Sequence, residues 1–229
     1  MKKIFLLSIS IALMASCSVK TNEEKARELI VPDVKEHLIK PEKFEIAEFR
    51  LDSCFSDQPQ NPGMFKFALD LNKIYREYKE YTEEAERAES YMSIYDDSYY
   101  QSAHEKLQEN KYRSEMEKAQ RKADDAKQKI LQLYKDNKQL FVDAYSGNHE
   151  FIGWVATFSF RTETAGGHDI MGGAMYFFDK DLTKIIYHLS EDDFKDLDVG
   201  KSNLEDVKYE FEEELREIFK DVKGKGDVN

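Results

Sequence analysis

The sequence is poor in positive charge. Its 229 residues include 34 lysines and arginines against 46 aspartates and glutamates, so the net charge is −12 at pH 7. No basic cluster offsets this balance, and an anionic surface repels the phosphates of nucleic acids. We therefore expect no nucleic-acid partner, and we expect the folded body to avoid anionic lipid head groups.

The sequence also lacks an apolar run that would cross a bilayer. Its longest run, residues 4–14, is interrupted by two serines, and a membrane-spanning helix needs roughly 20 apolar residues. Lys2 and Lys3 precede this run and small residues follow it, which is the order of a secretory signal peptide. We therefore expect residues 1–16 to direct export and then to be removed.

Cysteine is nearly absent, with Cys17 and Cys54 as the only two. Cys17 ends the stretch L-M-A-S-C, which resembles the bacterial lipobox, although methionine stands where leucine is more usual. The resemblance implies that a lipid is attached to the Cys17 thiol, that the signal peptide is cut before it, and that the new amino terminus is acylated. Several acyl chains exceed the two signals that stable attachment needs, so the chain would meet the membrane through this lipid. The alternative is an ordinary signal peptide that is cleaved nearby.

Export and lipidation would change the charge and the redox chemistry of the mature chain. Residues 1–16 contain Lys2 and Lys3 and no acid, so the net charge falls from −12 to −14 when they are removed. With Cys17 lipidated, Cys54 has no partner for a disulfide, even in an oxidising compartment. Cys54 follows an apolar stretch and has no cationic neighbour in sequence, so we expect a buried, inert thiol.

Capping and periodicity predict a leading helix and then a strand. Thr21 and Glu24 have the spacing of a capping box, and apolar residues then recur at helical spacing, with a kink or a second start expected at Pro32. From Phe44 the period changes to two, and a phase slip near Ala47 predicts a bulge.

The strongest pattern is a pair of heptad seams in which nearly all core positions are apolar or aromatic. One seam starts at Met64 and the other at Tyr112, and a polar, tyrosine-rich stretch separates them. Two such helices joined by a short tip pack as an antiparallel hairpin, which we assign to residues 64–141.

The sizes of the seam residues suggest a register for this hairpin. A turn near residue 97 would bring Leu71 and Ile74 close to Ala119 and Ala123. Large residues would then face small ones, as close packing of a two-helix core requires.

After Gly147 the pattern returns to strands. We expect a strand at 151–160, a loop at 164–173, and strands at 175–178 and 184–189, which together form an antiparallel meander. The acidic run at 191–193 is typical of a helix start capped by Ser190. Ser202 and Glu205 give a further capping-box pattern, and the apolar stripe that continues to Val222 predicts a C-terminal amphipathic helix.

These elements predict an α+β fold. A leading helix and a four-stranded antiparallel sheet form a body, a long antiparallel helical hairpin is inserted after the first strand, and an amphipathic helix follows the sheet. Because the two ends of the hairpin lie side by side, the insertion costs little closure entropy. Without the hairpin, the order looks like a cystatin-like arrangement, an analogy of topology that implies no protease inhibition.

The chain is predicted to divide into five parts. These are a signal peptide at 1–16, a lipidated tether at 17–21, an α+β body at 22–57 and 148–222, an inserted coiled-coil hairpin at 64–141, and a flexible tail at 223–229. Together with the lipobox, the segment from Leu38 to Phe44 and the stretches F-I-G-W and F-D-K-D-L-T-K-I resemble uncharacterised lipoproteins of Bacteroidota. The resemblance implies no known activity.

Side chains that could carry catalysis are scattered along the sequence. No two of the five histidines have the i, i+4 spacing that places both on one helical face for zinc. His149, His168 and His188 each have a carboxylate nearby, and they would form a metal site only if the ends of the strands met. We assign no catalytic residue, no metal and no cofactor, although carboxylates that only the fold brings together cannot be seen in a sequence.

The glycine-rich loop is a candidate ligand site. Its four glycines would let the backbone approach a ligand closely, and the candidate contacts are Gly167, His168 and Asp169. The lysine-containing motif that ends a phosphate-binding loop does not follow, and no helix begins after this loop whose amino end would hold an anion. A mobile hairpin loop without a ligand is the alternative interpretation.

The predicted tip of the hairpin is a candidate for partner contact. Four tyrosines crowd there, Tyr91, Tyr95, Tyr99 and Tyr100. Tyrosine combines a large rigid surface with a polar hydroxyl, which interfaces favour, and such rings also stack on carbohydrates. In the alternative interpretation, the rings only cap the coiled coil by packing on one another.

The sequence thus favours a non-catalytic, lipid-anchored protein of the cell envelope, on the outer membrane, periplasmic or cell-surface face. Its helical hairpin would bind a protein partner or a second copy of the chain. The alternative is an envelope hydrolase or a small-ligand, carbohydrate-type binder that uses the sheet and the glycine-rich loop.

Overall fold

The computed structural model describes residues 20–58, 61–96, 102–147 and 149–222. Contacts divide these residues into two compact units. The first unit contains the described residues up to Asp52 together with Gly153–His188. The second unit contains the described residues of Ser53–Ile152 together with those from Leu189 onward. Cys17, Tyr99, Tyr100 and the predicted tail at 223–229 lie outside the described residues.

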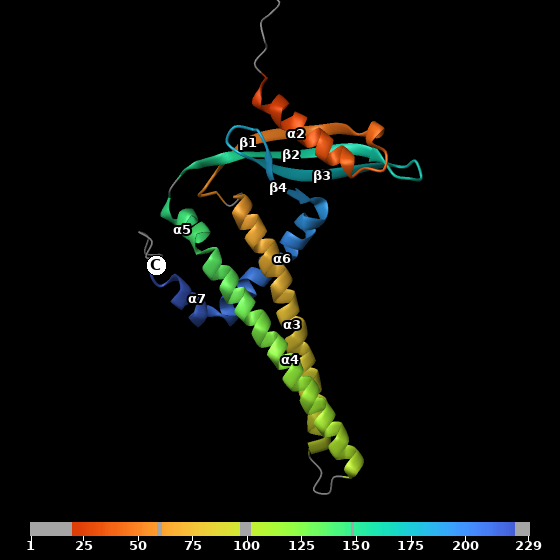
Figure 1. Cartoon of the computed structure of the whole chain (residues 1–229), viewed down its shortest axis with the longest axis vertical. Coiled ribbons are helices and arrows are strands. Elements are labelled where there is room, and N and C mark those ends of the chain that lie inside the picture. The colour runs from red at the N-terminus through yellow and green to blue at the C-terminus, as the bar shows by residue number, and fades with distance from the viewer. Residues whose placement is uncertain (1–19, 59–60, 97–101, 148, 223–229) are drawn as a thin grey trace, which may run out of the picture. The chain divides into compact units, whose positions relative to one another are not determined.

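The predicted α+β fold is confirmed. A leading helix, α2 (Asn22–Glu36), and a short 3-10 turn, η1 (Pro41–Lys43), precede the first strand. The strands β1 (Glu45–Phe55), β2 (Phe151–Glu163), β3 (Asp169–Phe178) and β4 (Ile185–Ser190) form one antiparallel sheet in the order β1-β2-β3-β4. Figure 1 shows α2 lying across one face of this sheet.

Helix α2 begins as the sequence predicts. The Thr21 hydroxyl accepts a hydrogen bond from the Glu24 backbone N–H at 3.2 Å, and the Glu24 carboxylate accepts one from the Thr21 N–H at 2.7 Å, which completes a capping box. The helix continues through Pro32 to Glu36 as one element, so the expected second start at Pro32 does not occur.

The core between α2 and the sheet is built from alternating strand residues and one stripe of the helix. Its buried members are Ala26, Ile30, Val34, Ala156, Phe158, Tyr176, Phe178 and Leu182. Phe44, Phe49 and Leu51 pack against this core. Along β1, Ile46 and Phe49 are half-buried whereas Ala47 and Glu48 are both exposed, so the alternation changes phase where the sequence predicts it.

The glycine-rich loop is shorter than predicted. Strand β2 ends at Glu163 and β3 begins at Asp169, so only Thr164–His168 connect them, and Gly172 and Gly173 lie inside β3. Gly172 pairs with Phe160 across the strands, and a Cβ at Gly172 would lie 2.5 Å from the Cζ atom of that ring. This glycine is therefore present because an aromatic ring covers its backbone.

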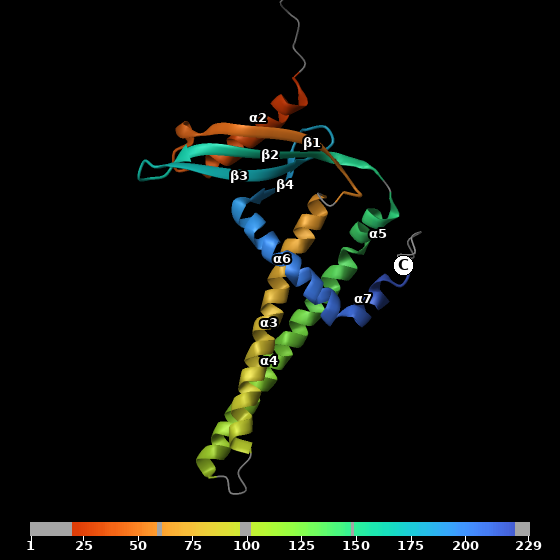
Figure 2. The same cartoon turned by 180° about the vertical axis from the view of Figure 1, so that it is seen from behind.

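The second unit contains the predicted helical hairpin. Helices α3 (Pro62–Asp96) and α4 (Ala103–Asp136) pack along each other in antiparallel directions, and α5 (Lys138–Ser146) follows α4. Figure 2 shows the two long helices side by side from the opposite direction.

The predicted register of the hairpin is wrong. Leu71 shares a buried cluster with Ile130, Leu131 and Tyr134, not with Ala123. The Phe67 ring also lies 4.9 Å from the Tyr134 ring, centroid to centroid. Large residues thus meet large ones at the base of the hairpin, because further helices cover this region and fill the space around them.

Two C-terminal helices provide that cover. Helix α6 (Glu191–Glu210) packs on α3, and α7 (Glu212–Phe219) packs on α4. Val207, Phe211 and Leu215 join the buried cluster at the base of the hairpin. The C-terminal segment therefore belongs to the hairpin unit and not to the predicted body at 148–222.

The helix start predicted at the acidic run 191–193 is confirmed, but the separate start predicted at Ser202 is wrong. Ser190 caps α6, with its side chain accepting from the Asp193 backbone N–H and the Asp193 carboxylate bonded to the Ser190 N–H. Ser202 lies within the bounds of α6 and does not start a helix. The acidic residues 191–193 thus occupy the first turn, where the helix dipole favours negative charge.

Candidate functional site

The far end of the hairpin brings together tyrosines from both helices. Tyr91 and Tyr95 of α3 each stack on Tyr112 of α4, with ring centroids 5.3 and 5.9 Å apart. The Lys111 Nζ atom lies 5.5 Å from the centroid of the Tyr112 ring. This stack shows that the described tyrosines pack on one another, as the capping interpretation requires, and it fixes the orientation of Tyr91.

The same end of the hairpin exposes large apolar side chains. Tyr91 is 52% exposed, Ile94 is 68% exposed and Leu107 is 65% exposed. Ile94 and Leu107 come from the last turns of α3 and the first turns of α4, so both helices contribute. We call Tyr91, Ile94 and Leu107 the tip patch.

A groove of about 370 Å³ runs beside the tyrosine stack. Its lining combines the two rings with charged and small residues: Glu84, Arg87, Ala88, Tyr91, Tyr112, Glu115, Lys118, Ala119 and Lys122. The tip of the hairpin therefore offers apolar, aromatic and charged groups within a short distance, which is the mixture found in protein interfaces.

The glycine-rich connection forms a tight hairpin turn. The Gly167 N–H donates to the Thr164 carbonyl at 3.0 Å, and the Thr164 N–H donates to the His168 carbonyl at 2.9 Å. Gly167 has φ +81°, as the last residue of a type I turn with a glycine bulge requires. Gly167, His168 and Asp169 therefore have a structural reason to be there, and His168 and Asp169 are exposed to solvent.

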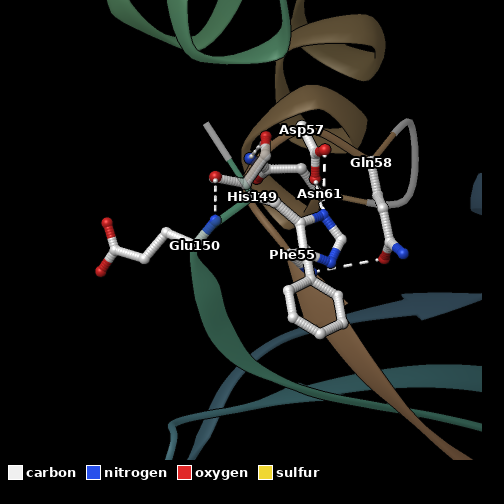
Figure 3. Close-up of polar contacts among 7 residues, drawn as sticks. Phe55, Asp57, Gln58, Asn61, His149 and Glu150 are labelled. Atoms are coloured by element: carbon white, nitrogen blue, oxygen red, sulfur yellow. Dashed lines mark hydrogen bonds and ion pairs between the residues drawn. The ribbon is translucent and has the colours of Figure 1, made fainter. Parts of the chain in front are cut away.

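A polar cluster that no sequence pattern indicated joins the two ends of the hairpin (Figure 3). His149 Nδ1 lies 2.9 Å from Asp57 Oδ1, and the imidazole stacks on the Phe55 ring with centroids 4.0 Å apart. The Ser56 N–H donates to the Glu150 carbonyl at 2.9 Å, and the Glu150 N–H donates to the Ser56 hydroxyl at 3.1 Å. These bonds hold the chain before α3 against the chain after α5.

The Asp57–His149 pair resembles part of a catalytic triad in one respect only. A carboxylate on Nδ1 orients the imidazole, but a nucleophile on the Nε2 side is also needed. The hydroxyl of Ser56, which belongs to the cluster, accepts a hydrogen bond from the Glu150 N–H and lies in a buried residue. We therefore interpret the pair as a structural contact that joins the two chain segments.

His188 lies in a third environment, on the sheet. Its ring stacks on Tyr176 with centroids 5.2 Å apart, and the Tyr176 hydroxyl donates to the Asp33 carboxylate. Burial, together with this hydrogen bond, raises the pKa of the Tyr176 phenol. The contact ties α2 to β3. His149, His168 and His188 thus have separate surroundings.

The described parts of the chain contain neither a metal-binding cluster nor a helix that could span a membrane. Across these residues, no three histidine, cysteine, aspartate or glutamate side chains gather closely enough to hold a metal ion. None of the helices that the structure describes is both long and apolar enough to span a bilayer. No protein-family model, curated protein or solved structure matches this chain.

Proposed function

We propose that this protein is a non-catalytic binding protein of the cell envelope, anchored by lipid on Cys17, and that the far end of its hairpin binds a protein partner. The observation that carries the proposal is the exposure of all three members of the tip patch, Tyr91, Ile94 and Leu107. The partner is either another protein or a second copy of the chain, and the experiment below distinguishes the two.

Two physical arguments support the tip patch as a contact surface. Single exposed apolar residues are normal on a protein surface, but here three occur near the same end of two paired helices. Tyr91 is also held by its stack on Tyr112, so it would lose little side-chain freedom on binding. Aromatic anchors of this kind contribute strongly to interface energy.

Site-specific photo-crosslinking in intact cells tests this function. A benzoylphenylalanine placed at Ile94 or at Leu107 should give the same discrete adduct, whose second component mass spectrometry identifies as one protein or as this chain itself. Gln128, an exposed residue of α4 nearer the base, is the matched control and should give no such adduct. The proposal fails if neither tip position yields an adduct, or if Gln128 yields the same one.

Anchoring by lipid has its own test. Cells that produce the natural protein should incorporate labelled fatty acid into it, and the Cys17→Ala variant should incorporate none, because the thiol is the acceptor. Continued labelling of the variant would refute the lipobox interpretation, while the crosslinking result would stand.

A further inference from the structure

A second groove lies at the base of the hairpin, where α6 and α7 cover α3, α4 and α5. Its volume is about 500 Å³, and its lining is mostly apolar. The lining includes the aromatic residues Tyr134, Phe141 and Phe219 and the charged residues Lys208, Glu212 and Arg216. This volume falls in the range of small-molecule sites, which are mainly apolar and contain a few polar groups that orient the ligand.

One of the lining residues has an unsatisfied polar atom. Tyr134 is 2% exposed, and no group in the described part of the chain lies within hydrogen-bonding reach of its buried hydroxyl. Leaving such a group without a partner costs free energy, and native proteins rarely do so. Burial raises the pKa of this phenol, so it remains a neutral hydroxyl that can donate a hydrogen bond to an acceptor.

Two rings that pack on the Tyr134 ring also line the groove. The Phe141 and Phe219 rings lie 5.7 and 6.2 Å from the Tyr134 ring, centroid to centroid. Both rings are only partly buried, and Phe219 is the last residue of α7. Because helices near a chain end open at low cost, a small movement of the end of α7 would give a ligand in the groove access to the Tyr134 hydroxyl.

The charged residues of the lining favour an anion. Lys208 is exposed and has no ion-pair partner among the residues described, whereas Arg216 pairs with Glu212 at 2.5 Å. The lining therefore has two cations and one carboxylate, on a chain with a net charge of −12. Lys208, the cation without an ion-pair partner among the described residues, would attract a negatively charged group to the groove.

We infer that this groove binds a free fatty acid, with the apolar chain against the apolar lining and the carboxylate accepting a hydrogen bond from the Tyr134 hydroxyl. The cations at Lys208 and Arg216 reduce the cost of bringing the carboxylate out of water. A purely apolar ligand would leave the hydroxyl without a partner, and a cationic amphiphile would be repelled by Lys208. The inference does not depend on what the tip patch binds.

Calorimetric titration of the lipid-free chain tests the inference. The protein is the exported chain with Cys17→Ala, so that no acyl group of its own competes, and the probe is dodecanoate below its micelle concentration. We expect saturable binding of one dodecanoate per chain. Dodecyltrimethylammonium, which has the same chain length and the opposite charge, should bind at least about tenfold more weakly.

Two tyrosine variants separate the hydroxyl contact from general packing. Tyr134→Phe should weaken dodecanoate binding about tenfold, the loss expected for a hydrogen bond to a charged group, and should stay folded because it removes an atom without a partner. Tyr75→Phe removes the hydroxyl of a buried tyrosine outside the groove and should leave the affinity unchanged. Lys208→Gln should weaken binding about threefold and reduce its dependence on salt.

Several results would overturn the inference. They are the absence of saturable binding, equal affinity of Tyr134→Phe and the unsubstituted chain, and equal binding of the two amphiphiles. Loss of the dodecanoate site in the natural lipidated protein would assign the groove to the protein's own acyl chain. The groove would instead be the contact site of a second copy of the chain if dodecanoate bound only in dilute solution and sedimentation experiments showed that a dimer dissociates over the same concentrations.

Discussion

At the scale of single residues, two buried tyrosines differ only in what their hydroxyls meet. Tyr75 and Tyr134 are each 2% exposed, but the Tyr75 hydroxyl donates to Glu210 at 3.1 Å, whereas that of Tyr134 has no partner among the described residues. Tyr75→Phe should therefore lower the free energy of unfolding by about 1 kcal/mol, and Tyr134→Phe should leave it unchanged or raise it. Urea unfolding of both variants measures this difference, and equal losses would contradict it.

A pair of neighbouring glycines provides a second residue-scale prediction. A Cβ at Gly172 would lie 2.5 Å from the Phe160 ring, which Phe44 and Phe158 hold at centroid distances of 5.5 and 5.7 Å. Gly172→Ala should therefore destabilise the protein by about 1–3 kcal/mol through overpacking. Thermal unfolding is the measurement.

Gly173 is the matched control for this change. The nearest atom to a Cβ at Gly173 is the Phe158 carbonyl oxygen at 3.7 Å, an ordinary contact. Gly173→Ala should be neutral or slightly stabilising, because alanine has less backbone freedom to lose. If both alanines cost the same, the ring contact is not what requires glycine at 172.

The sequence predicted some candidate residues and missed others for a physical reason. Tyr91 and Tyr95 were visible because they crowd into one end of a periodic segment. Asp57 and His149 are 92 residues apart, so only the meeting of the two hairpin ends brings them together. The hydroxyl of Tyr134 could not be identified as unpartnered, because its surroundings come from α3, α5 and α7.

At the scale of elements, the heptad pattern predicted two paired helices but not their register. Sliding one helix by seven residues keeps seam against seam, and the observed neighbour of Leu71, Ile130, lies seven positions beyond the predicted Ala123. The size-matching argument assumed a core of two helices only. In the structure, Val207, Phe211 and Leu215 fill the space beside the large residues at the base.

The two misplaced boundaries have similar causes. Glycines at 172 and 173 suggested a loop, although Phe160 lies across Gly172 within the sheet. Ser190 and Ser202 both begin a capping-box pattern, and the chain uses the first. Local signals gave the type of each element correctly, but tertiary contacts decided where the strand and the helix begin.

An ion pair between α4 and α7 predicts a dependence on pH. The Lys127 Nζ and a Glu214 carboxylate oxygen are 2.7 Å apart, and Lys127 lowers the pKa of the Glu214 carboxyl from its ordinary value of 4.5. This pair stabilises the fold when the pH is above the ordinary pKa of the carboxyl. The stabilisation is lost as the pH falls through the lower pKa that Glu214 has in the folded protein. Because the Glu214 side chain is 39% exposed, the effect at neutral pH should be only about 0.5 kcal/mol.

Glu214→Gln measures that contribution. The variant should unfold more easily than the unsubstituted protein at neutral pH, and the difference should vanish well below pH 4.5. Glu213→Gln, the adjacent residue, has no ion pair in the described structure and serves as the control. A difference that persists in acid, or an equal loss in Glu213→Gln, would contradict the assignment.

At the scale of the whole molecule, the hairpin and the C-terminal helices form one unit. Removing residues 64–141 would expose Val207, Phe211 and Leu215 of α6 and α7, because these residues share a core with the hairpin. The hairpin is therefore not an insertion that can be excised without consequence, although the sequence correctly placed it after the first strand. A useful deletion has to keep the base and remove only the far end.

The contacts define where such a deletion belongs. Lys122 Nζ lies 4.6 Å from the centroid of the Tyr81 ring, so a short linker can join the chain at these two positions. Removing residues 82–121 in this way keeps the base cluster and removes the tip patch. The shortened protein should keep the unfolding transition of its base, because none of the buried residues of that cluster is lost.

The most direct test of the proposed function is a competition experiment with this shortened protein. In envelope preparations that carry the photo-crosslinker at Ile94, an excess of intact lipid-free protein should suppress the adduct, and an equal excess of the shortened protein should leave it unchanged. Equal suppression by both proteins would place the contact outside the tip patch and contradict the account.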